Sequence, residues 1–387
     1  MRKLWKWAGR IVLALILAAA VVGLWKREEI ARLVAVNTLF SEEKIVANFS
    51  GMERAFLTVP VPRGDGPVSD LPQGPEMTLP ADVTGWIGAR AVTSLLVLHK
   101  GRIAHESYHL GTTAQDRRIS WSVAKSFLAA LVGISLERGE IESLDDPVTA
   151  YAPRLAGSAY DGVTLRQLLQ MTSGVEFDED YLDYDSDINR MGRVLALGGS
   201  MDGFAAGLSA RAAPPGTRWK YVSIDTHALA MALRGATGRA LPGLLSERII
   251  APLGVEAEPY YITDGDGVAF ALGGLNLTTR DYARFGLMVA RMGRYGGQQI
   301  VPAGWIAAST VPSAPTQEGA LQYGLHWWMP ADARDGEFYA HGIYGQYIYI
   351  DRARDVVIVV TSADRGFREP GVSEGNIDAL RNIAAEL

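Results

Sequence analysis

The chain has 387 residues, of which 48% are hydrophobic and 21% are charged, with a formal net charge of −6 and a pI near 5.6. Such a chain can bury a large core as one large or two modest domains. Its acidic balance gives no positively charged surface for a nucleic-acid backbone, so we expect no nucleic-acid partner. The sequence has no Cys, which excludes disulfides, thiolate catalysis and Cys-ligated metals.

The first 25 residues are typical of an export signal or a membrane anchor. An uncharged run covers residues 11–25, and basic residues precede it at positions 2, 3, 6 and 10. By the positive-inside rule, we expect residues 8–25 to anchor the chain in the inner membrane, with a periplasmic catalytic domain. Because a span needs about 20 residues, a signal peptide cleaved near residues 18–20, which would release the protein into the periplasm, stays open as an alternative.

Composition divides the remaining chain into two parts. Residues 26–85 begin with a charged helical pattern and then become rich in Pro and Gly, which indicates an arm lying over a domain. Residues 86–387 are the predicted catalytic domain. It opens with two strands around a Lys-Gly turn, between Val92 and Leu110.

Helical patterns fill the middle of this domain, and strands close it. Helices are expected at 123–138, 165–171, 226–236 and 279–292, strands at 346–351 and 356–361, and a last helix at the C-terminus. The predicted fold class is therefore α+β, with N- and C-terminal strands meeting in one antiparallel sheet.

The main candidate for chemistry is Ser122-Val-Ala-Lys125, at the start of a predicted helix. Residues three apart face the same side of a helix, so Lys125 can reach the hydroxyl of Ser122. Apolar neighbours would remove water from the amine and lower its pKa, which lets a neutral Lys accept the serine proton. The tetrapeptide alone is short, and its sequence context decides its meaning.

That context resembles the β-lactamase/penicillin-binding superfamily of serine hydrolases from residue 94 to the C-terminus. ISWSVAKSF is similar to the S-x-x-K helix of the superfamily, and GVTLRQLLQMTSGV to the segment that follows it. PPGTRWKYVSIDTHAL resembles the second motif, with Tyr221 and Ser223 at its key positions. LNLTTRDYARFGLMVARMGRYGGQQIVP resembles a later helix, and AHGIYGQYIYID lies where the third motif enters the sheet.

The resemblance implies a β-lactamase/transpeptidase-like fold: an antiparallel sheet flanked by helices, plus an all-helical subdomain. It also implies catalytic roles for Ser122, Lys125 and Tyr221. The oxyanion would be held by the backbone amides of Ser122 and Ile343, in the third-motif segment that includes His341 and Gly342.

Two motifs depart from the commonest pattern of the superfamily. Ser223 stands where the second motif often has Asn, and His341-Gly342 stands where many β-lactamases and transpeptidases have K-T-G. The missing Lys argues against efficient β-lactam turnover. The second motif, Tyr221-x-Ser223, and the G-I-Y-G-Q string at residues 342–346 are most similar to the 6-aminohexanoate-dimer hydrolase and carboxylesterase branch. This resemblance implies that Tyr181 contacts the substrate. Trp328 is a further candidate for an apolar pocket wall.

Two strings match unrelated enzyme motifs. His105-Glu-Ser-Tyr-His109 matches the zinc-protease H-E-x-x-H pattern but lies in a predicted strand, which separates the two imidazoles too far for one zinc ion. The G-x-S-x-G string around Ser373 lacks the later His that an α/β-hydrolase needs, so we expect Ser373 to cap the last helix. We expect no metal and no cofactor.

The other His residues, including His99, His227 and His326, are expected to be structural.

We therefore expect a serine hydrolase that cleaves small esters or amides through an acyl-enzyme on Ser122. A D,D-peptidase or β-lactamase acting on cell-wall peptides or β-lactams is one alternative. A catalytically silent penicillin-binding-like protein is another.

Overall fold

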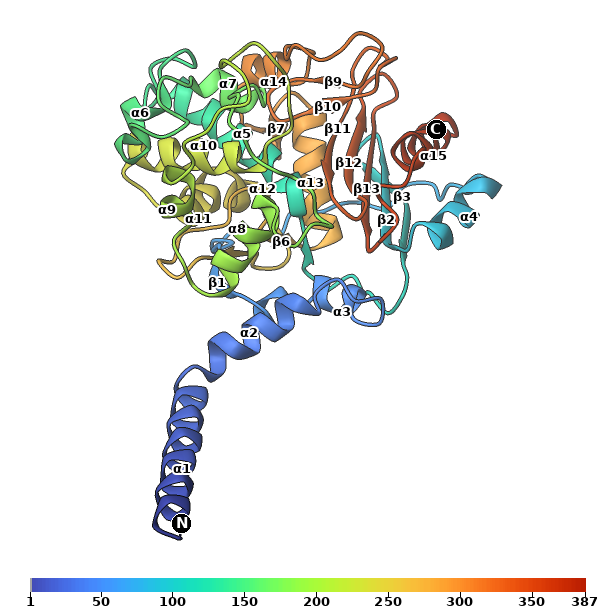
Figure 1. The fold of residues 1–387 in the computed structure, drawn as a ribbon. Helices are drawn as coiled ribbons and strands as arrows, with labels where there is room; N and C mark the ends of the chain where they lie inside the picture. Colours follow the sequence, from blue (N-terminus) through green and yellow to red (C-terminus); the bar gives the residue numbers. More distant parts are fainter. Residues whose placement is uncertain (1) are drawn as a thin grey trace.

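The structure is a computed structural model that describes residues 2–387. Its first helix, α1 (Arg2–Trp25), projects away from the body of the molecule (Figure 1). Within it, Trp5–Trp25 is long and apolar enough to cross a membrane or to act as a signal sequence. The apolar side chains of this stretch are exposed, so the body of the protein does not account for them.

A seven-stranded antiparallel sheet forms the centre of the molecule, in the order β3-β2-β13-β12-β11-β10-β9. The N-terminal hairpin pairs with the C-terminal strands, and Val97 lies opposite Ile358. This arrangement confirms the predicted sheet. The strands are β2 (Val92–His99), β3 (Arg102–Tyr108), β9 (Gln322–Tyr323), β10 (Trp328–Met329), β11 (Glu337–Gly342), β12 (Gln346–Asp351) and β13 (Val356–Ser362).

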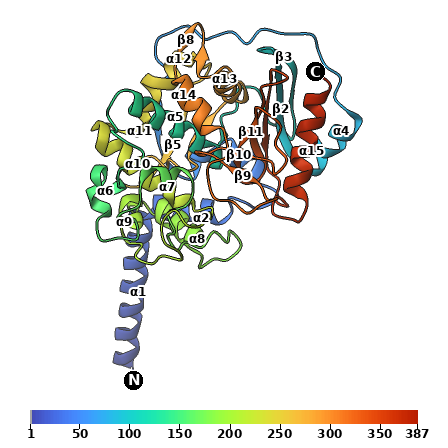
Figure 2. The ribbon, with the colours of Figure 1, turned by 90° about the horizontal axis from the view of Figure 1, so that it is seen from above.

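Helices cover both faces of this sheet (Figure 2). Successive side chains of a strand point to opposite faces, and here both faces carry apolar side chains that need to be buried. On one face, Val97 and Ile358 pack with α4 (Ala81–Ala89) and α15 (Val372–Ala385). On the other face, Leu96 and Val359 belong to the main core, together with α13 (Thr279–Ala290).

A helical region lies beyond α13, and α5 (Ala124–Glu137) is its central helix. Every side chain of α5 from residue 124 to 135 is buried, which fixes the start of this helix within the core. Around α5 lie α6 (Val148–Tyr151), η3 (Pro153–Leu155), α7 (Leu165–Leu169), α8 (Asp187–Ala196), α9 (Met201–Ala206), α10 (Ser223–Thr237), α11 (Leu241–Leu245), η4 (Ser246–Ile250), α12 (Ala251–Leu253) and α14 (Ala303–Ser309).

A second, smaller sheet lies beside this region, in the order β1-β5-β6-β4. Its strands are β1 (Leu57–Pro60), β4 (Arg118–Ile119), β5 (Tyr260–Thr263) and β6 (Leu275–Leu277), and a separate hairpin joins β7 (Arg294–Tyr295) to β8 (Gln298–Gln299). The chain leads from β4 directly into the 3₁₀ turn η2 (Trp121–Val123). The nucleophile candidate Ser122 therefore lies between a strand and the buried helix α5.

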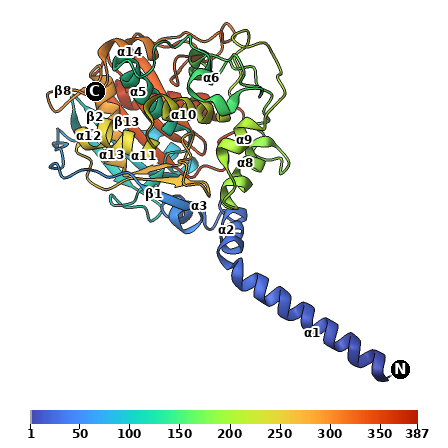
Figure 3. The ribbon, with the colours of Figure 1, turned by 90° about the vertical axis from the view of Figure 1, so that its left-hand side faces the viewer.

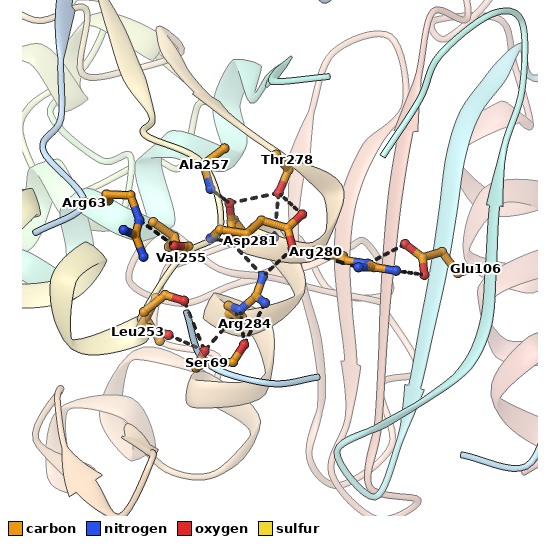
Figure 4. Close-up of polar contacts among 12 residues, drawn as sticks. Arg63, Ser69, Glu106, Leu253, Val255, Ala257, Thr278, Arg280, Asp281 and Arg284 are labelled. Atoms are coloured by element: carbon orange, nitrogen blue, oxygen red, sulfur yellow. Dashed lines mark hydrogen bonds and ion pairs between the residues drawn. The ribbon is translucent and has the colours of Figure 1, made fainter. Parts of the chain in front are cut away.

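Residues 26–85 pack against the rest of the molecule. After α1 come α2 (Arg27–Asn37), α3 (Ile45–Phe49) and η1 (Met52–Arg54), and Phe49 and Met52 are fully buried in the main core. The Pro-rich stretch is held by α13 through Arg284, which donates to the backbone oxygen of Ser69 at 2.7 Å and forms an ion pair with Asp281 at 2.8 Å (Figure 4). Beside it, Arg280 forms a two-pronged ion pair with Glu106 of β3.

The last helix differs from expectation at its start. Its N-cap residue is Gly371, in a left-handed conformation, and no side chain caps the helix. The prediction that Ser373 caps it is therefore wrong. With φ near 80°, this position favours glycine, so the backbone makes the turn that we had assigned to a serine side chain.

Candidate active site

Ser122 and Lys125 lie side by side at the start of α5. The Lys125 ammonium donates a hydrogen bond to Ser122 Oγ at 2.9 Å. It also donates to the backbone oxygen of Leu272 at 2.9 Å and reaches the hydroxyl of Ser223 at 3.5 Å. These three contacts hold the amine against the nucleophile. Ser122 itself belongs to the 3₁₀ turn η2 rather than to the α-helix, which begins at residue 124.

The environment of Lys125 favours the neutral amine. Its side chain is only 2% exposed, and burial lowers its pKa to about 7, a shift that the negative charges of Glu179 and Asp225 oppose. An amine with this pKa is neutral in a substantial fraction of molecules at neutral pH and can then accept a proton. The arrangement can therefore activate the hydroxyl of Ser122 as a nucleophile.

Tyr221 lies on the other side of the amine. The Lys125 nitrogen is 5.1 Å from the centre of the Tyr221 ring. Burial raises the pKa of Tyr221, and a hydrogen bond with the Ser122 side chain opposes that rise. Trp328 packs against the same ring with 5.1 Å between the centroids, and it therefore supports Tyr221. The ring of Trp328 also lies 6.1 Å from the ring of His341.

Ser223, the first residue of α10, connects the site to a loop. Its backbone amide and its hydroxyl both donate to the carboxylate of Glu179. The hydroxyl of Tyr181 donates to the same carboxylate at 2.9 Å. Burial raises the pKa of Glu179. One carboxylate thus positions both Ser223 and Tyr181 beside the Ser122–Lys125 pair.

A second carboxylate lies deeper in the core. Asp225 is fully buried and accepts hydrogen bonds from Tyr160 at 2.9 Å and Ser173 at 2.8 Å. Burial raises its pKa to about 7. Its other oxygen has no hydrogen-bond partner among the described residues. Asp225 therefore acts on the site through its charge and not through contact with Ser122.

The third-motif strand reaches the nucleophile at Gly342. A methyl group placed on Gly342 would lie 2.7 Å from the backbone oxygen of Ser120 and 3.0 Å from the backbone nitrogen of Ser122. Only glycine permits this close approach. This approach brings the end of β11 against the amide of Ser122. The next residue in the chain, Ile343, lines the same cavity as Ser122. The amide of Ser122 and the end of β11 are therefore neighbours at the edge of this cavity.

His341 is adjacent to this contact and carries no positive charge at neutral pH. Its ring stacks on Tyr347 at 4.5 Å, and burial lowers its pKa to about 4. A lysine at the equivalent place of a K-T-G motif would be a cation. The site therefore lacks, at this position, the charge that would pair with a carboxylate of a β-lactam or peptide.

A cavity of about 360 Å³ opens beside Ser122. Tyr181, Ser223 and Ile343 line it, whereas Trp328, the candidate for an apolar wall, does not and packs on Tyr221 instead. It is also lined by residues that the sequence did not indicate, including Leu39 and Phe40 from the segment after α2. Phe40 stacks on Tyr344 with 4.9 Å between the centroids, so the N-terminal segment touches the third-motif loop directly.

The remaining histidines lie outside this cluster. His105 on β3 and His109, the residue after this strand, both hydrogen-bond to Ser107, at 2.9 Å and 3.0 Å. Within residues 2–387, no group of three or more His, Cys, Asp or Glu side chains could hold a metal ion. His227 pairs with Asp202 at 2.9 Å in the helical region.

His326 is closer to the site but is engaged elsewhere. Its ring lies 3.3 Å from Thr226 Oγ1 and 3.4 Å from the hydroxyl of Tyr323. Burial lowers its pKa to about 3, so it stays neutral. Its backbone oxygen accepts from Ser126 on α5 at 2.8 Å, which is a structural role.

Comparison with known proteins identifies the class of the chain. The Beta-lactamase family model matches residues 85–380. A 6-aminohexanoate-dimer hydrolase of Paenarthrobacter ureafaciens is 32% identical over 284 residues, which cover 70% of this chain and 72% of the relative. The chain belongs to the Beta-lactamase family, and these relatives support a hydrolase.

Solved structures share the fold. A candidate 6-aminohexanoate-dimer hydrolase from Bacillus anthracis superposes with a TM-score of 0.79 at 24% identity, covering 89% of this chain and 95% of the other. A D-stereospecific amidohydrolase from Streptomyces gives a TM-score of 0.60 at 22% identity, covering 78% and 98%. The chain therefore has the β-lactamase/transpeptidase-like fold, as predicted.

Proposed function

We propose that this protein is a serine hydrolase that cleaves ester or amide bonds through an acyl-enzyme on Ser122. The observation that carries the proposal is the 2.9 Å contact between Ser122 Oγ and the amine of Lys125, a buried base whose pKa is lowered to about 7. A hydroxyl next to a neutral amine in a water-poor site is the arrangement that nucleophilic catalysis requires.

The reaction would proceed in two balanced steps. Ser122 Oγ bonds to the carbonyl carbon while Lys125 accepts its proton, and the backbone amides of Ser122 and Ile343 stabilise the oxyanion. The bond to the leaving alcohol or amine then breaks, and Tyr221 passes that proton to the leaving group. Water next attacks the acyl-enzyme, gives up a proton to the same base, and releases the carboxylic acid with Ser122 restored.

The relatives and the third motif favour an esterase or amidase over a β-lactamase. The curated relative is by name a hydrolase of a 6-aminohexanoate dimer. Here the third motif carries the neutral His341, so a β-lactam carboxylate would lack a cationic partner at that position. We therefore propose a small ester or amide as substrate.

We also propose that α1 anchors the protein in the inner membrane with the catalytic domain in the periplasm. Trp5–Trp25 has the required length and apolar character, and basic residues precede it on the N-terminal side. Removal of α1 as a signal peptide would leave the same catalytic domain in the periplasm.

Intact-mass analysis of the full chain in detergent tests the proposed function. The protein is incubated with a fluorophosphonate and, separately, with penicillin, and wild type is compared with Ser122→Ala. We expect the wild type to form an adduct with the fluorophosphonate and no adduct with penicillin. Ser122→Ala should not form the fluorophosphonate adduct. A penicillin adduct would assign a penicillin-binding enzyme instead. Failure of both reagents to label the wild type would overturn the proposal in favour of a silent binding protein.

A further inference from the structure

The cavity beside Ser122 is mostly apolar. Its wall is built largely from hydrophobic side chains, among them Leu39, Met52, Ile188, Met191, Leu195 and Phe270. A polar group in such a wall would lose its hydrogen bonds to water without replacement, which is costly. An apolar chain gains free energy from the same wall. The cavity therefore selects a hydrocarbon part of the substrate.

The chain that directly follows α1 supplies part of this wall. Val36, Leu39 and Phe40 all line the cavity. Arg32 of α2 holds this segment against α8, because its guanidinium donates to the backbone oxygen of Ala196 at 3.2 Å. The helix α1 leaves the body on the side where α2 meets α8 (Figure 3). A membrane that contained α1 would thus lie next to the cavity wall.

Exposed apolar side chains gather on this side. Within residues 5–387 and outside α1, nine large hydrophobic residues are exposed, and five lie on α2 or between residues 182 and 197. These five are Ile30, Val34, Leu182, Tyr184 and Leu197. Leu182 is 88% exposed, and both it and Tyr184 also line the cavity. Exposed apolar residues beside a membrane helix are typical of a surface that contacts lipid.

A second cavity, lined in part by Tyr221, has charged side chains in its wall. Tyr221, which we assign to protonate the leaving group, lines this cavity of about 860 Å³. Charged side chains line it as well, among them Arg218, Asp332 and Arg381. Ser122 lines the apolar cavity and not the charged one, so the acyl chain would lie in the apolar cavity, and a leaving group protonated by Tyr221 would extend toward the charged one.

We propose that the substrate has a long apolar acyl chain, joined by an ester or amide bond to a polar leaving group, and that it enters from the lipid bilayer beside α2. This inference rests on the proposed hydrolysis at Ser122 and names its substrate class. The acyl chain would pass from the membrane between α2 and α8 to reach the nucleophile.

A chain-length series tests the acyl cavity. Full-length protein in phosphatidylcholine vesicles is assayed with nitrophenyl esters from butyryl to dodecanoyl, with Ser122→Ala as the blank. Each methylene that enters the cavity should raise kcat/KM about fourfold until the cavity is full. A profile that is flat or falls with length would overturn the inference and leave the proposed function intact. Absence of any hydrolysis that depends on Ser122 would overturn the proposed function itself.

A glycine in the cavity lining offers a way to shorten the cavity. Gly192 lines the cavity, and a methyl group at this position would meet nothing within 4 Å. Gly192→Leu should lower the ratio of dodecanoyl to butyryl hydrolysis at least about tenfold. Gly85→Leu on the distant helix α4 is the matched control, since it too meets open space. Equal ratios in both variants would overturn the assignment of the cavity.

Entry from the bilayer is tested on side chains outside the cavity lining. Ile30→Ser with Val34→Ser should lower hydrolysis of the dodecanoyl ester in vesicles at least about fivefold. The soluble butyryl ester should be hydrolysed as by the wild type. The matched control is Leu110→Ser with Val311→Ser, which removes exposed apolar residues elsewhere. Unchanged hydrolysis of the vesicle-bound ester would exclude entry from the bilayer.

Discussion

The carboxylate of Glu179 accepts a hydrogen bond from the backbone amide of Ser223, at the point where α10 begins. The same side chain sets the electrostatics of the base. Burial lowers the pKa of Lys125 to about 7, and the negative charge of Glu179 works against that shift. Glu179 would therefore help to set the pH at which Lys125 acts as the proposed base, although its hydrogen bonds are to Ser223 and Tyr181.

Glu179→Gln should shift the pH profile to lower pH. Loss of the negative charge removes an influence that raises the pKa of Lys125, so the amine becomes neutral at a lower pH. Below its pKa the amine is protonated and cannot accept the serine proton, so kcat/KM rises with pH through that pKa. The profile is measured with a soluble ester. The control is Glu176→Gln, which changes an exposed residue of the same segment. If the ascending limb of the pH profile in Glu179→Gln stayed at the wild-type pH, the prediction would be contradicted.

Tyr221→Phe should affect amides more than activated esters. An amine leaving group must be protonated, whereas nitrophenolate leaves without a proton. Loss of the hydroxyl should therefore lower kcat for an anilide by about 10²-fold or more and for the nitrophenyl ester much less. The phenyl ring keeps its packing on Trp328, which limits structural damage. Equal losses for both substrates would show that Tyr221 has a different role.

Gly342→Ala should disable the oxyanion hole. The added methyl would lie 2.7 Å from Ser120 O and 3.0 Å from Ser122 N, so the strand must move away from the nucleophile. Loss of one oxyanion donor costs about 10²- to 10³-fold in kcat, and we expect a loss of that size in the rate of Ser122 acylation by the fluorophosphonate.

Gly304→Ala, whose methyl meets nothing within 4 Å, serves as the control for Gly342→Ala. The thermal midpoint is recorded for both variants. The acylation rate of Gly342→Ala is compared with the fraction of this variant that remains folded. If the rate fell only as far as the folded fraction did, a specific effect on the site would be ruled out.

Arg284→Met should destabilise the fold. Its side chain is 3% exposed and pairs with Asp281, which is fully buried. Removing the partner leaves a buried carboxylate unpaired, which typically costs about 3–5 kcal/mol, and it also removes the hydrogen bonds from Arg284 to Ser69. Urea denaturation measures the loss. Arg166→Met, which breaks a pair exposed to solvent, should change the midpoint little. If both variants unfolded at the same urea concentration, the buried pair would not support the fold.

Much of the fold was predictable because its signals are local. In the hairpin at β2–β3, an apolar run at residues 95–98 leads into the turn Lys100-Gly101. Both turn residues adopt positive φ values, of 53° and 74°. The helix after Ser122 shows apolar side chains at helical spacing. The strands at 346–351 and 356–362 contain apolar runs, at residues 347–350 and 356–360, as expected for a buried sheet.

The candidate site was predictable only in part. Ser122, Lys125 and Ser223 come together within 3.5 Å, and their motifs pointed to that. Glu179 was missed because it is one of six acidic residues between positions 178 and 187, and only long-range folding places this one against α10. The N-terminal wall was missed for the same reason. Its composition indicated an arm over a domain but could not indicate that Phe40 would stack on Tyr344.

The pairing of β2 with β13 has a consequence for synthesis of the protein. Leu96 and Val359 lie opposite each other although most of the catalytic domain separates them in the chain. Contacts this distant form slowly and only when both partners exist. Gly342 also reaches Ser122 from the late part of the chain. A nascent polypeptide on the ribosome would therefore carry its nucleophile without an oxyanion hole, so hydrolysis could begin only after translation had nearly ended, and a chain truncated before β11 would be inert.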